Sequence, residues 1–157
     1  MVVVLNNSLY RFARVYSNES QTNFFNALIA CFHEIGGVPE ALFFDNMKTV
    51  VTDASDKVFN ERFLQFASHY GFQTNACNPA SPQEKGTVEK SVSVIRTTAF
   101  GYHDSFSSLK EANKHLRSVL SAINNSPVSH RDLVPVEGLK KRKKGISSAS
   151  FNGFLSV

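Results

Sequence analysis

The sequence predicts an α/β fold in which a mixed β-sheet is flanked by helices. Short apolar runs of strand length alternate with stretches whose apolar residues recur every three and four positions. The helical stretches end at glycine and proline stop signals. A chain of 157 residues that is 42% hydrophobic is also long enough to form one domain with a real core. The resulting order of elements is β-β-α-β-α-β, followed by further helices.

The first two elements are expected to form a hairpin. Residues 1–5 are an apolar, mostly β-branched run, and residues 6–8 supply turn-forming side chains. Residues 10–16 then alternate as a second strand does.

A helix is expected after the hairpin, capped by Ser20 or Thr22 and ended by Gly36. Its apolar residues repeat at helical spacing. Residues 41–44 form a short apolar run between Pro39 and polar residues, which favours a buried parallel strand.

A second helix is predicted from the apolar residues between positions 59 and 70, and Gly71 closes it. Residues 72–76 are expected to be a further strand. This completes the β-α-β-α-β part of the fold.

Two starting points are open for the third helix. Ser81 and Glu84 form a capping box with Pro82 at the first helical position, which predicts a start there. Gly86 argues for a later start near Thr87, with residues 79–86 as a mobile loop, because a glycine costs about 1 kcal/mol inside a helix.

A fourth helix is predicted from the capping box of Ser108 and Glu111 and from the apolar face that follows, and it ends near Asn124. Beyond it come prolines, a basic run and a Ser/Gly-rich end. We therefore expect one domain over residues 1–125 and an extended, poorly packed basic tail over residues 126–157.

The positive charge of the chain is concentrated in that tail. The net charge is +4, and five positive charges lie on consecutive residues: Lys140, Lys141, Arg142, Lys143 and Lys144. Such a run after a near-neutral globule suits an arm that contacts nucleic-acid phosphates. A solvated, disordered terminus is the alternative interpretation.

Several classes of protein are excluded by composition. No apolar run approaches the roughly 20 residues that span a bilayer, and residues 1–5 lack the features of a signal peptide. We therefore expect a soluble, cytoplasmic protein without a membrane partner, whose Cys31 and Cys77 are reduced. The five histidines lack metal-ligand spacing, so no zinc site is expected.

Two carboxylates are the candidates for chemistry. In an open sheet of β-α-β units, ligands gather beyond the carboxyl ends of the parallel strands. Asp45 follows one such strand, and Glu89 lies on the helix that follows the other. A pair of carboxylates that meet there would offer the hard oxygen ligands that Mg²⁺ or Mn²⁺ prefers.

The residues around both acids carry a family resemblance. Residues 43–49 read Phe-Phe-Asp-Asn-Met-Lys-Thr, and residues 78–91 read Asn-Pro-Ala-Ser-Pro-Gln-Glu-Lys-Gly-Thr-Val-Glu-Lys-Ser. Together they resemble the retroviral-integrase superfamily of transposases, and most closely the IstA-type transposases of bacterial insertion sequences. The segment 66–72 also has a counterpart there, and the resemblance covers roughly residues 1–125.

The resemblance implies an RNase H-like core in which three carboxylates hold two divalent metal ions. Asp45 and Glu89 match the second and third acids. The first acid is missing, since no Asp or Glu precedes Glu19, and with it the first, central strand of the sheet. Binding of Mg²⁺ or Mn²⁺ is therefore expected to be weak or absent.

The resemblance further implies DNA integration by metal-dependent strand cleavage and strand transfer. DNA is the implied partner, together with a second copy or a full-length transposase. The chain is expected to be a core fragment that is inactive alone; a non-catalytic remnant that binds nucleic acid or a transposase, and a plain dimerisation module, are the alternatives. The DNA-contacting candidates are Lys85, Lys90, Arg96 and residues 140–144, and the loop candidates are Asn46, Asn78, Pro82, Gln83 and Gly86.

Overall fold

The structure is a computed structural model that describes residues 1–44, 51–53, 58–76, 82–102, 105–129, 132–141 and 149–152. Its elements are β1 (Val2–Leu5), β2 (Arg11–Ala13), α1 (Gln21–Ile35), β3 (Ala41–Phe44), β4 (Val51–Asp53), β5 (Val58–Phe59), α2 (Glu61–Tyr70), β6 (Gln73–Ala76), α3 (Pro82–Phe100), α4 (Leu109–Asn125), α5 (Pro135–Lys141) and β7 (Ala149–Asn152).

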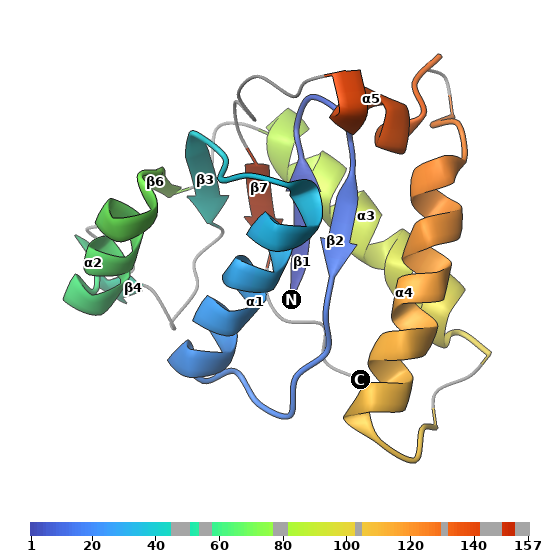
Figure 1. Cartoon of the computed structure of the whole chain (residues 1–157), viewed down its shortest axis with the longest axis horizontal. Helices are drawn as coiled ribbons and strands as arrows, with labels where there is room; N and C mark the ends of the chain where they lie inside the picture. The colour runs from blue at the N-terminus through green and yellow to red at the C-terminus, as the bar shows by residue number, and fades with distance from the viewer. Residues whose placement is uncertain are drawn as a thin grey trace.

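A mixed five-stranded sheet forms the centre of the molecule, in the order β2-β1-β7-β3-β6 (Figure 1). β1 is antiparallel to both β2 and β7, whereas β3 is parallel to both β7 and β6. Helix α1 covers one face of the sheet, and α3 and α4 lie on the other side. The expected mixed sheet with flanking helices is therefore confirmed.

Strand β1 explains how the two faces are built. All of its side chains are buried, which fits a strand inside the sheet. Val3 and Leu5 belong to the core under α1, whereas Val2 and Val4 belong to the core with Ile95 of α3. The alternation of side chains along one strand thus divides the core into two layers.

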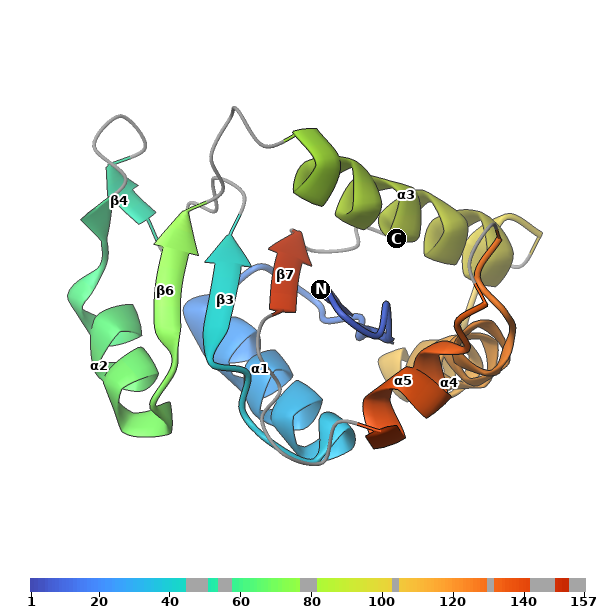
Figure 2. The same ribbon diagram turned by 90° about the horizontal axis from the view of Figure 1, so that it is seen from above.

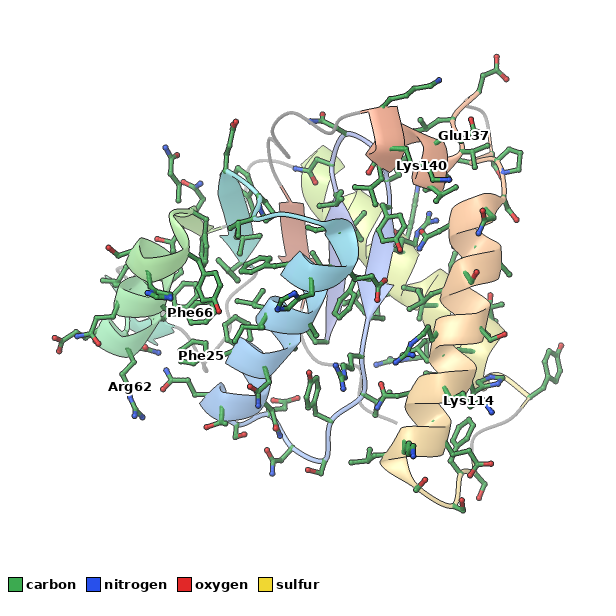
Figure 3. All side chains as sticks on the ribbon, in the orientation of Figure 1. Phe25, Arg62, Phe66, Lys114, Glu137 and Lys140 are labelled. Carbon is green, nitrogen blue, oxygen red and sulfur yellow. The ribbon has the colours of Figure 1, made fainter. Side chains whose placement is uncertain are left out.

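An aromatic cluster joins α1, β3 and α2. Phe44 at the end of β3 makes an edge contact with Phe63 of α2 at a centroid distance of 5.0 Å, and Phe24 of α1 lies 5.8 Å from Phe63. Phe25 and Phe66 stack between the two helices at 4.5 Å (Figure 3). The high phenylalanine content therefore serves packing.

The helix boundaries largely follow the capping signals. Ser20 accepts from the backbone N–H of Asn23, and Gly36 ends α1 in the left-handed region at φ 77°. Ser108 caps α4 through the backbone N–H of Glu111. α2 begins at Glu61 because Asn60 is its N-cap, so Phe59, expected on that helix, instead lies in β5.

Two further differences from expectation concern local structure. α3 begins at Pro82, as the capping box predicts, and Gly86 lies inside this helix rather than in a loop. β4 and β5 pair as a small antiparallel sheet that the apolar pattern did not indicate.

The region beyond residue 125 is not an extended tail throughout, which corrects the expectation. Residues 135–141 form α5, and Leu139 packs against the core under α1. Residues 149–152 form β7, which lies between β1 and β3 and pairs with both. The slot of the central strand, whose usual strand the sequence lacks, is therefore filled by a distant part of the same chain, whose backbone groups satisfy the two neighbouring strands. None of the helices in the described ranges is long and apolar enough to cross a membrane.

Candidate functional site

The carboxyl ends of three strands meet at one edge of the sheet. β3 runs parallel to β6 and to β7, with Phe44 paired to Ala76 on one side and to Phe151 on the other. In Figure 2 the three arrowheads point the same way, toward the side where α3 begins. The structure thus brings the end of β3 and the first turns of α3 to a common edge. This is the edge beyond the carboxyl ends of the parallel strands, where ligands are expected to bind.

Phe44 fixes the end of β3 at this edge. Its side chain is 1% exposed and packs between Phe24, Phe59 and Phe63. Such a packed anchor holds the chain direction immediately before Asp45. Asp45 itself, with Asn46 and Asn78, lies outside the described residues.

Helix α3 presents Glu89 away from the core. Ser91, Ile95 and Ala99 are buried and follow each other at intervals of four, so this stripe faces the sheet. Glu89 and Arg96 are seven positions apart on an exposed stripe of the same helix. Lys90 is exposed next to them. For Pro82, Gln83 and Lys85, the structure describes the helical backbone only.

The described part of the basic run, Lys140 and Lys141, is not at this edge. Lys140 and Lys141 are exposed at the end of α5. Gly138 of α5 lies close to Ser8 in the turn that follows β1. Because β1 is antiparallel to β7, with Leu5 paired to Ala149, this turn lies at the amino end of β7. α5 therefore lies at the opposite edge of the sheet from the start of α3 (Figure 2), and Lys140 is labelled on this helix in Figure 3. Arg142, Lys143 and Lys144 are outside the described residues.

Arg11 is a cation in contact with α3 that the sequence did not indicate. Its Nε donates to the Oγ of Ser91, two positions from Glu89 on α3, at 3.1 Å. Burial lowers the pKa of the Arg11 guanidinium from its usual value. A contact across 80 positions has no local pattern, so only the isolated charge in an apolar strand could have drawn attention to it.

A complete metal-binding cluster is not present in the described ranges, where no three His, Cys, Asp or Glu side chains converge. Strand β7 reads Ala-Ser-Phe-Asn, so the central strand offers no carboxylate. Asp45 and Glu89 are hard oxygen donors of the kind that Mg²⁺ prefers. The donor set thus suits this ion chemically but contains two acids rather than three.

Comparison with known proteins was made by sequence and by structure, and no family model matches the chain. A protein of insertion sequence element IS5376 from Geobacillus stearothermophilus is 34% identical over 139 residues, which are 87% of this chain and 34% of that protein. The transposase for IS1326/IS1353 from Pseudomonas aeruginosa is 34% identical over 70% of this chain and 22% of its own length. The transposase for IS232 from Bacillus thuringiensis subsp. berliner is 28% identical over 90% of this chain and 33% of its own length. The chain therefore spans about a third of the length of these relatives or less.

Two solved structures show the same fold. A chain of the simian T-cell lymphotropic virus intasome in complex with PP2A regulatory subunit B56 gamma superposes with a TM-score of 0.72 and 16% identity, over 90% of this chain and 48% of that chain. The catalytic core domain of BIV integrase gives a TM-score of 0.69 and 17% identity, over 89% of this chain and 84% of that domain. The fold is that of an RNase H-like integrase catalytic core. Together with the insertion-sequence relatives, it identifies the chain as a transposase core of the integrase superfamily.

Proposed function

We propose that this core serves DNA transposition, with Asp45 and Glu89 as the acids that bind a divalent ion, Mg²⁺ or Mn²⁺. The observation that carries the proposal is the shared edge: β3 ends directly before Asp45 at the side of the sheet where α3, the helix of Glu89, begins. The relatives named as transposases of insertion sequences support a role in transposition.

The roles of the side chains follow from their chemistry. A bound divalent ion would supply Lewis acidity at a phosphodiester oxygen. Asp45 and Glu89 would hold it, and Lys90 and Arg96, exposed beside Glu89, would position the phosphate backbone of DNA. Asn46 and Asn78, together with Pro82, Gln83, Lys85 and Gly86 in the first turns of α3, surround these positions in the sequence and would shape the approach of the DNA.

The experiment that tests this proposal is a DNA-nicking assay in Mn²⁺. Because the first acid is lacking, no strand transfer is expected from the chain alone, and the weak nicking that two acids can support in Mn²⁺ should be lost in Asp45→Asn and in Glu89→Gln. The matched controls are Asp132→Asn and Glu137→Gln, which change exposed acids outside α3 and the edge. Nicking that survives both site substitutions would contradict the assignment of the acids.

A non-catalytic DNA-binding role is the second candidate, and one observation favours it. The central strand β7 carries no acid, so the third carboxylate of a full site is lacking among the described residues of the sheet. In this case DNA binding would be sensitive to salt but indifferent to Asp45→Asn and Glu89→Gln. The protein partner would be a second copy or a full-length transposase, and sedimentation at several concentrations would reveal self-association.

A further inference from the structure

A groove of about 680 Å³ lies between α3 and the C-terminal end of α4. One side is formed by Arg11 of β2 with Lys90, Ser93 and Thr98 of α3. The other side is formed by the end of α4 and residues 126–129. The groove is separate from the exposed stripe of Glu89 and Arg96, since neither residue lines it.

Arg11 is held at the groove without a carboxylate partner. Its backbone N–H and C=O both bond to Asn124, and its Nε bonds to the neutral hydroxyl of Ser91. No described Asp or Glu forms an ion pair with its guanidinium. A half-buried charge of this kind loses hydration that one bond to a neutral hydroxyl does not fully replace, so an anion in the groove would stabilise it.

The remaining groups in the groove also suit an anion. Lys90 adds a second positive charge, and Ser93, Thr98 and Ser129 add hydroxyl donors, whereas the hydroxyl of Ser126 already donates to the carbonyl oxygen of Ala122. None of the lining residues is acidic. The groove therefore combines two cations and several neutral donors with no opposing charge.

The mixture of polar and apolar residues that line the groove favours a polymeric ligand over a small ion. Val94, which is 44% exposed, and Ile123 give the groove apolar surface between its polar groups. This mixture fits a polymer in which charged groups alternate with less polar ones, as phosphates alternate with sugars. The wall of residues 126–129 also leads along the chain to α5, where Lys140 and Lys141 are exposed.

We propose that the groove between α3 and the end of α4 binds the phosphodiester backbone of nucleic acid, with Arg11 as its central cation. This proposal rests on the proposed role in DNA transposition but concerns a surface distinct from the two acids. It assigns to Arg11 and Lys90 a contact that holds DNA in the absence of any metal ion.

The test measures binding of a short fluorescent DNA duplex to the full chain in EDTA, over a series of salt concentrations. Arg11→Met should weaken binding at low salt about tenfold. It should also reduce the steepness of the plot of log affinity against log salt concentration by about 1, because one phosphate contact is lost. Arg11→Lys keeps the positive charge and should therefore leave the dependence of affinity on salt concentration unchanged. Arg117→Met removes the same charge from an exposed site outside the groove and should change affinity less than about twofold.

A second pair of variants leaves Arg11 and its hydrogen bonds intact. Ala122 and Ser121 are neighbours on α4 and both are exposed, but only Ala122 lines the groove. Ala122→Glu should therefore weaken DNA binding several-fold more than Ser121→Glu, although both change the net charge equally. Equal effects of these two variants, or unchanged binding in Arg11→Met, would overturn the proposal.

Competition distinguishes the source of the anion. Unlabelled DNA should displace the labelled duplex. Inorganic phosphate and a polyglutamate peptide should displace it no more than a simple salt does at the same ionic strength. Displacement by polyglutamate, with loss of its effect in Arg11→Met, would assign the groove to acidic protein segments and overturn the proposal. The binding test is made in EDTA and does not depend on a metal ion. A negative result in the nicking assay therefore does not decide whether the groove binds DNA.

Discussion

Asn124 and Asn113 make the same pair of hydrogen bonds from α4, the first to the edge strand β2 and the second to the segment that follows it. Asn124 accepts from the N–H of Arg11 at 2.9 Å and donates to its C=O at 2.8 Å. Asn113 accepts from the N–H of Val15 at 3.0 Å and donates to the C=O of Val15 at 2.9 Å. The two asparagines are eleven positions apart, about three helical turns, and so lie on one side of α4. The helix thereby satisfies outer backbone groups of β2 and of the segment after it that a further strand would otherwise satisfy.

This relationship predicts that Asn124 is a stability determinant. Asn124→Ala should lower the free energy of unfolding by about 2 kcal/mol, because it removes a buried side chain and leaves the partly buried N–H and C=O of Arg11 without their partner. Asn125→Ala is the control, since Asn125 is exposed and bonds only to Ser121 one turn earlier. Urea unfolding measures both. Similar losses in the two variants would show that the edge contact contributes little.

The same residues show what the sequence revealed about α4 and what it did not. The capping box and the apolar positions predicted the helix itself, because both signals are local. Asn113 and Asn124 lie on the same stripe as Leu116 and Leu120, and two amides on an apolar stripe are a signal of buried polar contacts. Their partners on β2 and the segment after it could not be deduced, since they are about a hundred positions away.

Sequence analysis did not predict strand β7, because this strand also depends on partners that are distant in the sequence. Residues 149–152 are a weak strand by composition, and their pairing with β1 and β3 depends on the slot between those strands rather than on local preference. At the candidate site, sequence predicted the shared edge of β3 and α3, because strand order and strand direction determine it. Sequence did not predict that α5 and its lysines lie at the opposite edge, because that placement depends on packing against the hairpin.

The position of β7 leads to a second prediction. Ser150 is paired with Val4 on one side and with Phe43 on the other. Ser150→Pro should lower the free energy of unfolding by about 3 kcal/mol or more, because proline removes a ladder donor in the middle of a sheet. Ser150→Thr keeps the backbone donor and should stay within about 1 kcal/mol of the wild type. If denaturant unfolding cannot separate the two variants, β7 does not hold β1 to β3.

Tyr10 predicts a dependence of stability on alkaline pH. Burial, reinforced by the Glu34 carboxylate that accepts its hydroxyl at 3.1 Å, raises the pKa of Tyr10 to about 12 from its usual 10.0. The folded protein therefore keeps this proton between pH 10 and 12, whereas the unfolded chain releases it. The contribution of Tyr10 to stability should be complete below pH 10 and should be lost as pH rises to 12.

Urea unfolding over that pH range tests the effect of Tyr10. The free energy of unfolding should fall more steeply for the wild type than for Tyr10→Phe, which has no proton to release at this position. Tyr16 is an internal reference, because burial also raises its pKa and it is present in both proteins. Parallel pH profiles would mean that Tyr10 titrates alike in the folded and unfolded states.

Gly86 predicts a gain in stability next to the candidate site. It lies within α3, three positions before Glu89, and a Cβ added there would meet no atom within 4 Å. Gly86→Ala should raise the free energy of unfolding by about 0.5–1 kcal/mol, because alanine favours the helix and restricts the unfolded chain. Gly36→Ala should instead destabilise the protein by about 1 kcal/mol, although space is also free there, because Gly36 has a φ of 77°. Calorimetric melting of both variants would settle whether residue 86 serves as a helical position. A loss of stability in Gly86→Ala would contradict the assignment of residue 86 to the interior of α3.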